Sequence, residues 1–151
     1  MNSSVEIDQD TFQDLVKFYG ETFNLPPLAA KIYAYLIFDF DKKGICFEEF
    51  VEILSASKSS VSANLNLLLN ANLITDFNKI DERKRFFLIN ENYIVLRFEE
   101  IIEKMKREIQ ILDKLNDFRK TKSADTNPRF EIYKSLLNNN IVNIQDTLLK
   151  L

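Results

Sequence analysis

Residues 55 to 74 read SASKSSVSANLNLLLNANLI, and this stretch decides the fold. Its first half is small, polar and rich in serine, and its second half is a ladder of leucines. Ser57 is a favourable residue to cap the start of a helix, and Asn72 tolerates the left-handed backbone that is common just after a helix end. The stretch therefore predicts a helix from Lys58 to about Ala71.

This helix has an apolar side and a small, hydrogen-bonding side. On a helical wheel four apolar residues share one arc, which we expect to be buried: Val61, Leu65, Leu68 and Leu69. The opposite side carries Ser59, Ser60, Ala63 and Asn66, with Ser62 at its flank. Short polar side chains let a helix backbone approach a major groove and bond base edges or phosphates. The alternative is that these serines merely fill a solvated helix face.

The flanking sequence places this helix in a recognisable order of elements. Apolar spacing predicts helices over residues 11–23, from Pro26 or Pro27 to about Phe38, and over residues 47–55. Alternation after Asn72 predicts a β-hairpin, with strands at Leu73–Phe77 and Arg85–Ile89 and a basic tip between them. A short helix, a break, a second helix and such a hairpin is the order of a winged helix-turn-helix.

The C-terminal third predicts two further helices. Residues 93 to 118 carry a heptad seam of Val95, Phe98, Ile102, Met105, Ile109 and Leu112, widened by Ile101, Ile111 and Leu115. A polar linker, RKTKSADTNP, precedes a last helix over residues 129–149. We expect a mainly α fold with a small β-hairpin wing, made of an N-terminal dimerisation helix (1–24), a winged helix-turn-helix domain (25–92) and C-terminal dimerisation helices (93–151).

Composition excludes several classes of function. The chain of 151 residues is 46% hydrophobic and 28% charged, as in a globular protein. It has no histidine and only two glycines, so neither imidazole chemistry nor a glycine-rich phosphate loop is available. We therefore expect no enzyme, no catalytic residues and no cofactor. The lone Cys46 forms no intrachain disulfide, and with no signal peptide or long apolar run we expect a cytoplasmic protein without membrane contact.

Residues 39 to 50, DFDKKGICFEEF, resemble a calcium-binding EF-hand loop but lack two of its ligands. Position five is Lys43 and position twelve is Phe50, where the loop requires oxygen ligands. The sequence favours an ordinary turn at Gly44 followed by a short strand at Ile45 and Cys46, and no metal site.

Charge is segregated along the chain although the net charge is −3. Residues 1–24 hold five acids against one base, whereas residues 58–85 hold five bases against three acids. The hairpin tip KIDERKR could reach a minor groove, with Arg83 inserted and Asp81 bracing its guanidinium. We expect phosphate contacts from Lys58, Lys79, Lys84 and Arg85. The alternative for the tip is a solvated hairpin turn.

Three segments resemble the GbsR branch of MarR-type bacterial transcriptional regulators: FNLPPLAAKIYAYLIF, FEEFVEILSASKSSVSANLNLLLNANLI and DERKRFF. The resemblance spans about residues 15–118. It implies a homodimeric winged helix-turn-helix that binds palindromic operator DNA, usually as a repressor with a small-molecule effector. By position, Lys58, Ser59, Ser60, Ser62 and Asn66 match the recognition helix, and Asp81, Arg83 and Lys84 match the wing. Ala63 stands where these proteins commonly have arginine, Asn72 where they commonly have glycine, and the apolar Leu67 where they usually have a polar residue.

The remaining apolar surface predicts a two-fold dimer. The heptad seam and the aromatic first helix (Phe12, Phe18, Tyr19, Phe23) find no partner of sufficient size within a three-helix winged core, so we expect terminal helices of two chains to pack together. A candidate effector pocket is lined by Phe18, Tyr19, Tyr33 and Phe98, all aromatic side chains that otherwise belong to the hydrophobic core. The competing function is a winged-helix module that binds proteins rather than DNA.

Overall fold

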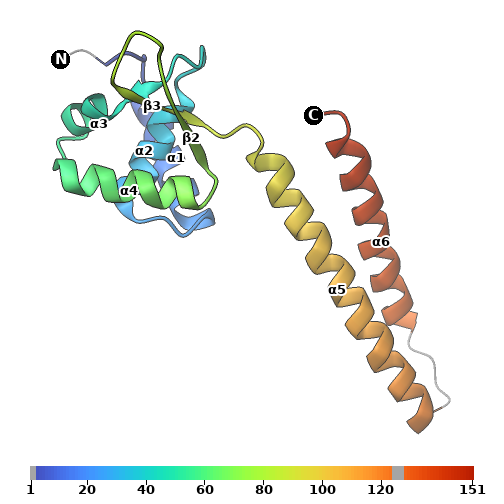
Figure 1. The fold of residues 1–151 in the computed structure, drawn as a ribbon. Helices are drawn as coiled ribbons and strands as arrows, with labels where there is room; N and C mark the ends of the chain where they lie inside the picture. The colour runs from blue at the N-terminus through green and yellow to red at the C-terminus, as the bar shows by residue number, and fades with distance from the viewer. Residues whose placement is uncertain (1–2, 124–127) are drawn as a thin grey trace. The chain divides into compact units, whose positions relative to one another are not determined.

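The structure is a computed structural model that describes residues 3–123 and 128–151. These residues form two compact units, one ending at Glu91 and the other beginning at Asn92, and each is described by itself. Figure 1 shows the chain with its helices and strands labelled. The helices are α1 (Gln9–Thr22), α2 (Pro27–Ile37), α3 (Phe47–Ile53), α4 (Lys58–Asn70), α5 (Tyr93–Lys122) and α6 (Pro128–Leu148), and the strands are β1 (Ile45–Cys46), β2 (Ile74–Asn78) and β3 (Arg85–Ile89).

Helix α2 is the centre of the first unit. It has buried residues on every side, as expected for a helix that is apolar all round. Helix α4 contributes Val61, Leu65 and Leu68 to the same core, and each is at most 2% exposed. Rings from α3 and β3 complete it, because Phe50 lies 6.1 Å from Phe87 between ring centroids. The predicted inward side of α4 is therefore the side that packs.

Helix α1 also packs within this unit, against α2 (Figure 1). The Tyr19 and Phe23 rings meet the Tyr33 ring edge-on, with centroids 5.1 and 5.9 Å apart, and Phe12 lies 6.5 Å from Phe38. The expectation that the aromatic residues of the first helix lack a partner inside the domain is wrong for these three. Periodicity marks an apolar face but does not say which element covers it. The role of α1 in dimerisation stays a prediction.

A short turn joins α3 to α4 and sets the helix-turn-helix. Ser55 takes a positive φ of 50° inside this turn, and Ser57 then caps α4 by accepting a hydrogen bond from the backbone N–H of Ser60, at 3.2 Å. At the other end Asn72 has a φ of 60°. Both predicted helix boundaries are thus confirmed, each by the local backbone chemistry of one residue.

The sheet is antiparallel with strand order β1-β3-β2. In the hairpin, Phe77 pairs with Phe86 and Asn78 with Arg85. Gly44 leads into β1 with a φ of 87°, and a Cβ at this position would lie 2.8 Å from the Phe77 ring. Both the backbone conformation and the lack of space therefore exclude a side chain here. Two helices followed by such a hairpin make this unit a winged helix-turn-helix, which confirms the predicted fold.

The EF-hand-like stretch forms a turn. The Asp39 carboxylate is 8% exposed and accepts hydrogen bonds from the backbone N–H groups of Lys43 (3.2 Å) and Gly44 (2.9 Å). Its oxygens therefore hold the turn together. Among the residues that the structure describes, no group of side chains is arranged to hold a metal ion.

The second unit is a pair of helices, with α6 running beside α5 (Figure 1). Ile102 of the predicted seam is buried, as are Leu137 and Ile141 of α6. Lys134 Nζ lies 2.7 Å from an Asp113 carboxylate oxygen and links the two helices. Helix α5 extends through the first residues of the predicted linker, and residues 124–127 of that linker lie outside the described residues.

Two residues of the widened seam are not packed. Ile111 is 54% exposed and Leu115 is 60% exposed, although both were expected to broaden the apolar side of α5. They lie on the side of the helix away from Ile102, since they follow it by nine and thirteen positions. Within the described ranges, every helix is too short or too polar to cross a bilayer.

Candidate nucleic-acid interface

The small polar side of α4 is a continuous exposed stripe. Ser59, Ser62, Ala63 and Asn66 follow one another at spacings of three, one and three residues, which places them on one helix face, and all four are exposed. The opposite face is buried in the core, so the orientation of the helix about its own axis is fixed. The four side chains of this stripe are short, which allows close approach of the helix backbone to another surface, and the longer Leu67 lies beside them, four residues after Ala63.

The N-terminal turn of α4 is linked internally through its serines. The Ser57 hydroxyl donates to Ser60 Oγ at 2.9 Å and lies 3.3 Å from Ser59 Oγ. The Asn64 amide donates to the Ser60 carbonyl at 2.8 Å. The structure shows no hydrogen bond from the side chains of Ser62 and Asn66 anywhere in residues 3–123 and 128–151. These two side chains are available to a ligand, and the first backbone N–H groups of the helix are available at its N-terminus.

The wing carries its cations beyond the last strand pair. Lys79, Arg83 and Lys84 are all exposed. Lys79 is nonetheless positioned, because its ammonium lies 4.1 Å from the centroid of the Phe86 ring. Within the described part of the chain, Arg83 and Lys84 take part in no ion pair, and Asp81 makes no hydrogen bond to Arg83. The two cations are therefore the wing's freely available charges, and the bracing role predicted for Asp81 remains a prediction.

Arg85 differs from the other predicted phosphate contacts. Its Nε lies 2.6 Å from Asp76 Oδ2 on the neighbouring strand, and its guanidinium carbon lies 5.0 Å from the Phe87 ring centroid. Lys58, by contrast, is exposed at the start of α4. The structure thus brings Lys58 and the serine stripe onto one helix, places Lys79, Arg83 and Lys84 on the wing, and holds Arg85 against the strands.

Two exposed residues beside the predicted ones are apolar. Leu67 on α4 is 36% exposed, and Ile80 at the wing tip is fully exposed. Leu67 is a departure from the resemblance, which implies a polar residue there, whereas Ile80 lies within the predicted tip KIDERKR and was given no role. The signal that could have found Ile80 is its residue type, because turns favour glycine, proline, asparagine, aspartate and serine.

The predicted effector-pocket residues are divided between the two units. Phe18, Tyr19 and Tyr33 belong to the first unit and Phe98 to the second, so the pocket stays a prediction. Tyr19 contacts both other rings, with centroid distances of 5.1 Å in each case. Phe18 is 51% exposed and borders a surface depression of about 320 Å³ on α1, lined by Asp14, Lys17, Phe18, Glu21 and Thr22.

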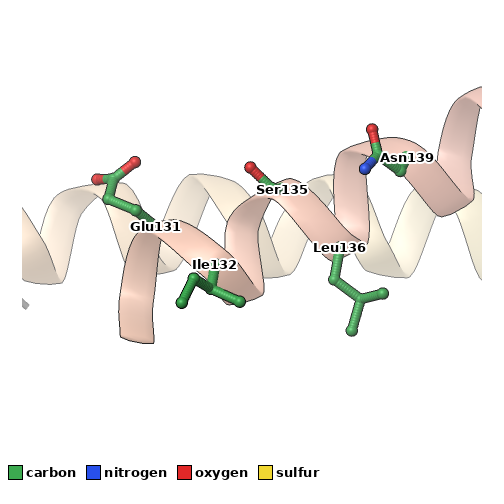
Figure 2. A pocket seen from close by; sticks show the side chains of 5 residues that line it. All are labelled: Glu131, Ile132, Ser135, Leu136 and Asn139. Atoms are coloured by element: carbon green, nitrogen blue, oxygen red, sulfur yellow. The ribbon is translucent and has the colours of Figure 1, made fainter. Parts of the chain in front are cut away.

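A second depression lies on the outer surface of α6 and has a volume of about 450 Å³. Figure 2 shows Glu131, Ser135 and Asn139 in a row along one side of this helix, with Ile132 and Leu136 projecting on the other. Ile132 is 70% exposed and Leu136 is 54% exposed. One helix supplies all five lining residues, so this depression is an open surface with apolar side chains along one side and is not an enclosed cavity.

Comparisons with known proteins identify the fold. No family model and no curated protein sequence matches the chain. A crystal structure described as that of a transcriptional regulator superposes with a TM-score of 0.54 and 21% sequence identity, covering 94% of this chain and 95% of that one. The structure of S. aureus MepR in complex with DNA gives a TM-score of 0.46 and 16% identity, covering 76% of this chain and 94% of that one. At this identity the first match shows a shared fold.

Proposed function

We propose that this protein is a sequence-specific DNA-binding transcriptional regulator of the MarR type, close to its GbsR branch. The observation that carries the proposal is the exposed stripe of Ser59, Ser62, Ala63 and Asn66 on a helix whose other face is sealed into a winged core. The stripe offers hydroxyl and amide groups to base edges, and Lys58 stands at its start for a phosphate. The resemblance of the sequence and the description of the superposed structure as a transcriptional regulator agree with this reading.

The wing supplies the second contact in this proposal. Arg83 and Lys84 are free of ion pairs in the described residues, and Lys79 is held beside them by the Phe86 ring. A cationic wing tip next to a recognition helix is suited to bind the adjacent minor groove, where arginine meets the strongest negative potential. Phosphates bound by these side chains position the protein, and the α4 stripe provides the sequence preference.

We propose that the active form is a two-fold homodimer that binds a palindromic operator. Two recognition helices then lie about 34 Å apart, the rise of one turn of DNA. An apolar stripe on α5 supports the dimer: Ile111, Leu115 and Phe118 follow one another at spacings of four and three residues and are 54%, 60% and 60% exposed. Such a stripe on a soluble helix favours burial against a second helix pair.

Regulation by a small molecule completes the proposal, with the protein acting as a repressor. An effector must bind the DNA-competent and incompetent forms with unequal affinity. The exposed ring of Phe18 is the accessible member of the predicted aromatic set, and a ring of this kind suits an organic cation. Thermal unfolding with a panel of small organic cations, tetramethylammonium included, tests this part, with Phe18→Ala as the control that abolishes any shift in Tm.

Selection of bound sequences from a random DNA pool tests the main proposal. The expected product is a palindrome whose half-sites are about one helical turn apart. Purified protein then binds that duplex tightly and loses affinity steeply as salt rises, because several phosphate contacts per subunit release counterions. Recovery of no enriched sequence, together with no retention on heparin or nonspecific DNA at low salt, would favour the protein-binding module instead.

A further inference from the structure

The tip of the wing is a tight turn with an isoleucine at its apex. The backbone N–H of Glu82 donates to the Lys79 carbonyl at 3.1 Å, which closes a four-residue turn with Ile80 and Asp81 at its centre. Ile80 has a relative exposure of 101%, so none of its side chain is covered by the protein. Neither central residue takes a positive φ, and the turn therefore does not require glycine.

The fold gives no reason for an isoleucine at this position. Turn positions favour residues that bend the chain or bond their own backbone, whereas β-branched side chains suit strands in which neighbours cover them. The apolar contacts of the hairpin lie further back, where the Phe77 and Phe86 rings stack with centroids 5.7 Å apart. Lys79 lies over Phe86 and fixes the base of the tip. The Ile80 side chain thus lies at the tip of an ordered hairpin and packs against no other residue that the structure describes.

We propose that Ile80 is a minor-groove contact of this wing, packed against the deoxyribose walls and base edges beside Arg83, while Lys79 and Lys84 bind phosphates. This inference rests on the proposed DNA-binding function. Lys79 precedes the isoleucine, and Arg83 and Lys84 follow it three and four residues later, so the apolar tip stands between positive charges. Proteins that read minor grooves combine arginine and lysine with apolar side chains placed at the base steps.

The rest of the unit favours DNA over an anionic membrane as the occupant. A lone isoleucine is a weak membrane anchor, because stable anchoring needs a second signal such as a broad apolar face or a polybasic patch. The exposed α4 stripe of Ser62 and Asn66 instead presents hydrogen-bonding groups. Two acids, Asp81 and Glu82, also lie within the tip, so the positive charge is local to the flanks and does not form a polybasic surface.

Binding of wild-type protein, Ile80→Ser, Ile80→Leu and Lys84→Ala to the selected operator tests the inference. We expect Ile80→Ser to weaken binding about tenfold, which corresponds to partial burial of one aliphatic side chain, and Ile80→Leu to retain it. The slope of affinity against salt stays unchanged in Ile80→Ser, because no phosphate contact is lost. The same slope falls by about one per subunit in Lys84→Ala.

Base substitution beneath the wing identifies the groove. Replacing A·T pairs there with G·C pairs adds an amino group to the minor-groove floor, whereas inosine·C pairs leave that floor unchanged. Wild-type protein should bind the G·C operator more weakly than the inosine·C operator, and Ile80→Ser should lose this discrimination. The double-mutant cycle between protein and DNA measures the coupling directly.

Each outcome separates the two proposals. If wild-type protein enriches no DNA sequence, the proposed function and this inference both fail. If wild-type protein binds its operator and Ile80→Ser matches it in affinity and in G·C discrimination, the function stands and the role of Ile80 is overturned. A variant that keeps its DNA affinity but loses binding to phosphatidylserine vesicles overturns it in favour of a membrane contact. Circular dichroism melting confirms that each variant is folded.

Discussion

Arg85 and Asp76 form an ion pair across the two strands of the wing, with Arg85 Nε 2.6 Å from Asp76 Oδ2. The Arg85 guanidinium also lies over the Phe87 ring, so the side chain is held against the sheet on two sides. Arg83, two residues closer to the tip, takes part in no ion pair among the described residues. The two arginines of this short segment therefore differ in their contacts: Arg85 is paired with Asp76, and Arg83 is exposed and unpaired among the described residues.

Arg85→Ala should affect the fold more than the recognition of DNA. Both partners of the ion pair are partly exposed, at 48% and 38%, so solvent screening limits the expected loss of unfolding free energy to about 1 kcal/mol or less. Denaturant unfolding and operator titration are measured on the same preparations. A loss of operator affinity larger than that of Arg83→Ala would show that Arg85 leaves Asp76 to bind a phosphate.

Arg83→Ala should lose about 1–3 kcal/mol of operator affinity per site with no change in stability. The side chain is exposed and unpaired in the described residues, so its removal leaves no buried charge behind. Fluorescence anisotropy with the selected operator provides the measurement. Lys104→Ala is the matched control, since Lys104 lies on α5 in an exposed pair with Glu100 and its removal also takes away one positive charge. If the two variants lost the same operator affinity, Arg83 would contribute only through the net charge of the protein and not through a specific contact.

Ala63→Arg should strengthen DNA binding. Ala63 is exposed in the middle of the α4 stripe, at the position where similar regulators commonly carry arginine. A guanidinium added there reaches a phosphate or a guanine edge, and we expect the magnitude of the salt slope to rise by about one per subunit. Ala63→Gln, which adds length without charge, is the control. An arginine variant that binds more weakly than wild type would indicate that the α4 backbone approaches DNA too closely for a long side chain.

Leu115→Glu should shift the oligomeric state. The residue is 60% exposed on α5 between two other exposed apolar residues of the same stripe, and a buried carboxylate there would oppose association. Light scattering at micromolar concentration should give a dimer for wild type and the 17.7 kDa monomer for the variant. Gln110→Glu, an exposed change outside the stripe, should remain dimeric. A wild-type monomer would contradict the proposed dimer outright.

Tyr35 should make the stability of the fold sensitive to alkaline pH. Burial raises the pKa of its phenol, and the hydrogen bond that the phenol donates to Glu49 Oε2, at 2.5 Å, raises it further. A tyrosine in the unfolded chain ionises at about pH 10. The unfolded chain therefore releases this proton at a lower pH than the folded chain, so the stabilisation is complete below about pH 10 and is lost as pH rises above that value.

Unfolding of wild type and Tyr35→Phe in denaturant, followed from about pH 8 to about pH 11, measures this linkage. Tyr35→Phe should be less stable by about 1–3 kcal/mol at neutral pH, because among the described residues the buried Glu49 carboxylate then keeps only its hydrogen bonds from Ser4. Its stability should then fall less than that of wild type as the pH rises. Tyr133→Phe is the exposed counterpart: its hydrogen bond to Glu108 also raises the pKa of this phenol, but solvent screening should make its effect on the alkaline fall smaller than that of Tyr35→Phe.

The local features of the winged unit follow from the sequence alone. The bounds of α4 depend on a capping serine at one end and a left-handed asparagine at the other, and both act within a few residues of themselves. The strand at Ile45 and Cys46 and the turn before it follow from Gly44 and Asp39. The exposure of the serine stripe follows from helical period, because the apolar arc of α4 fixes which side faces outward.

Contacts between distant residues were decided by the tertiary structure. Periodicity shows that α1 and α5 have apolar faces, but not that α1 rests on Tyr33 of α2 or that Leu115 of α5 stays exposed. The pairing of Arg85 with Asp76 depends on hairpin register, which is set by the strands together and not by either residue. A sequence pattern specifies which residues share a face, whereas the partner that covers the face is chosen by packing among elements far apart in the chain.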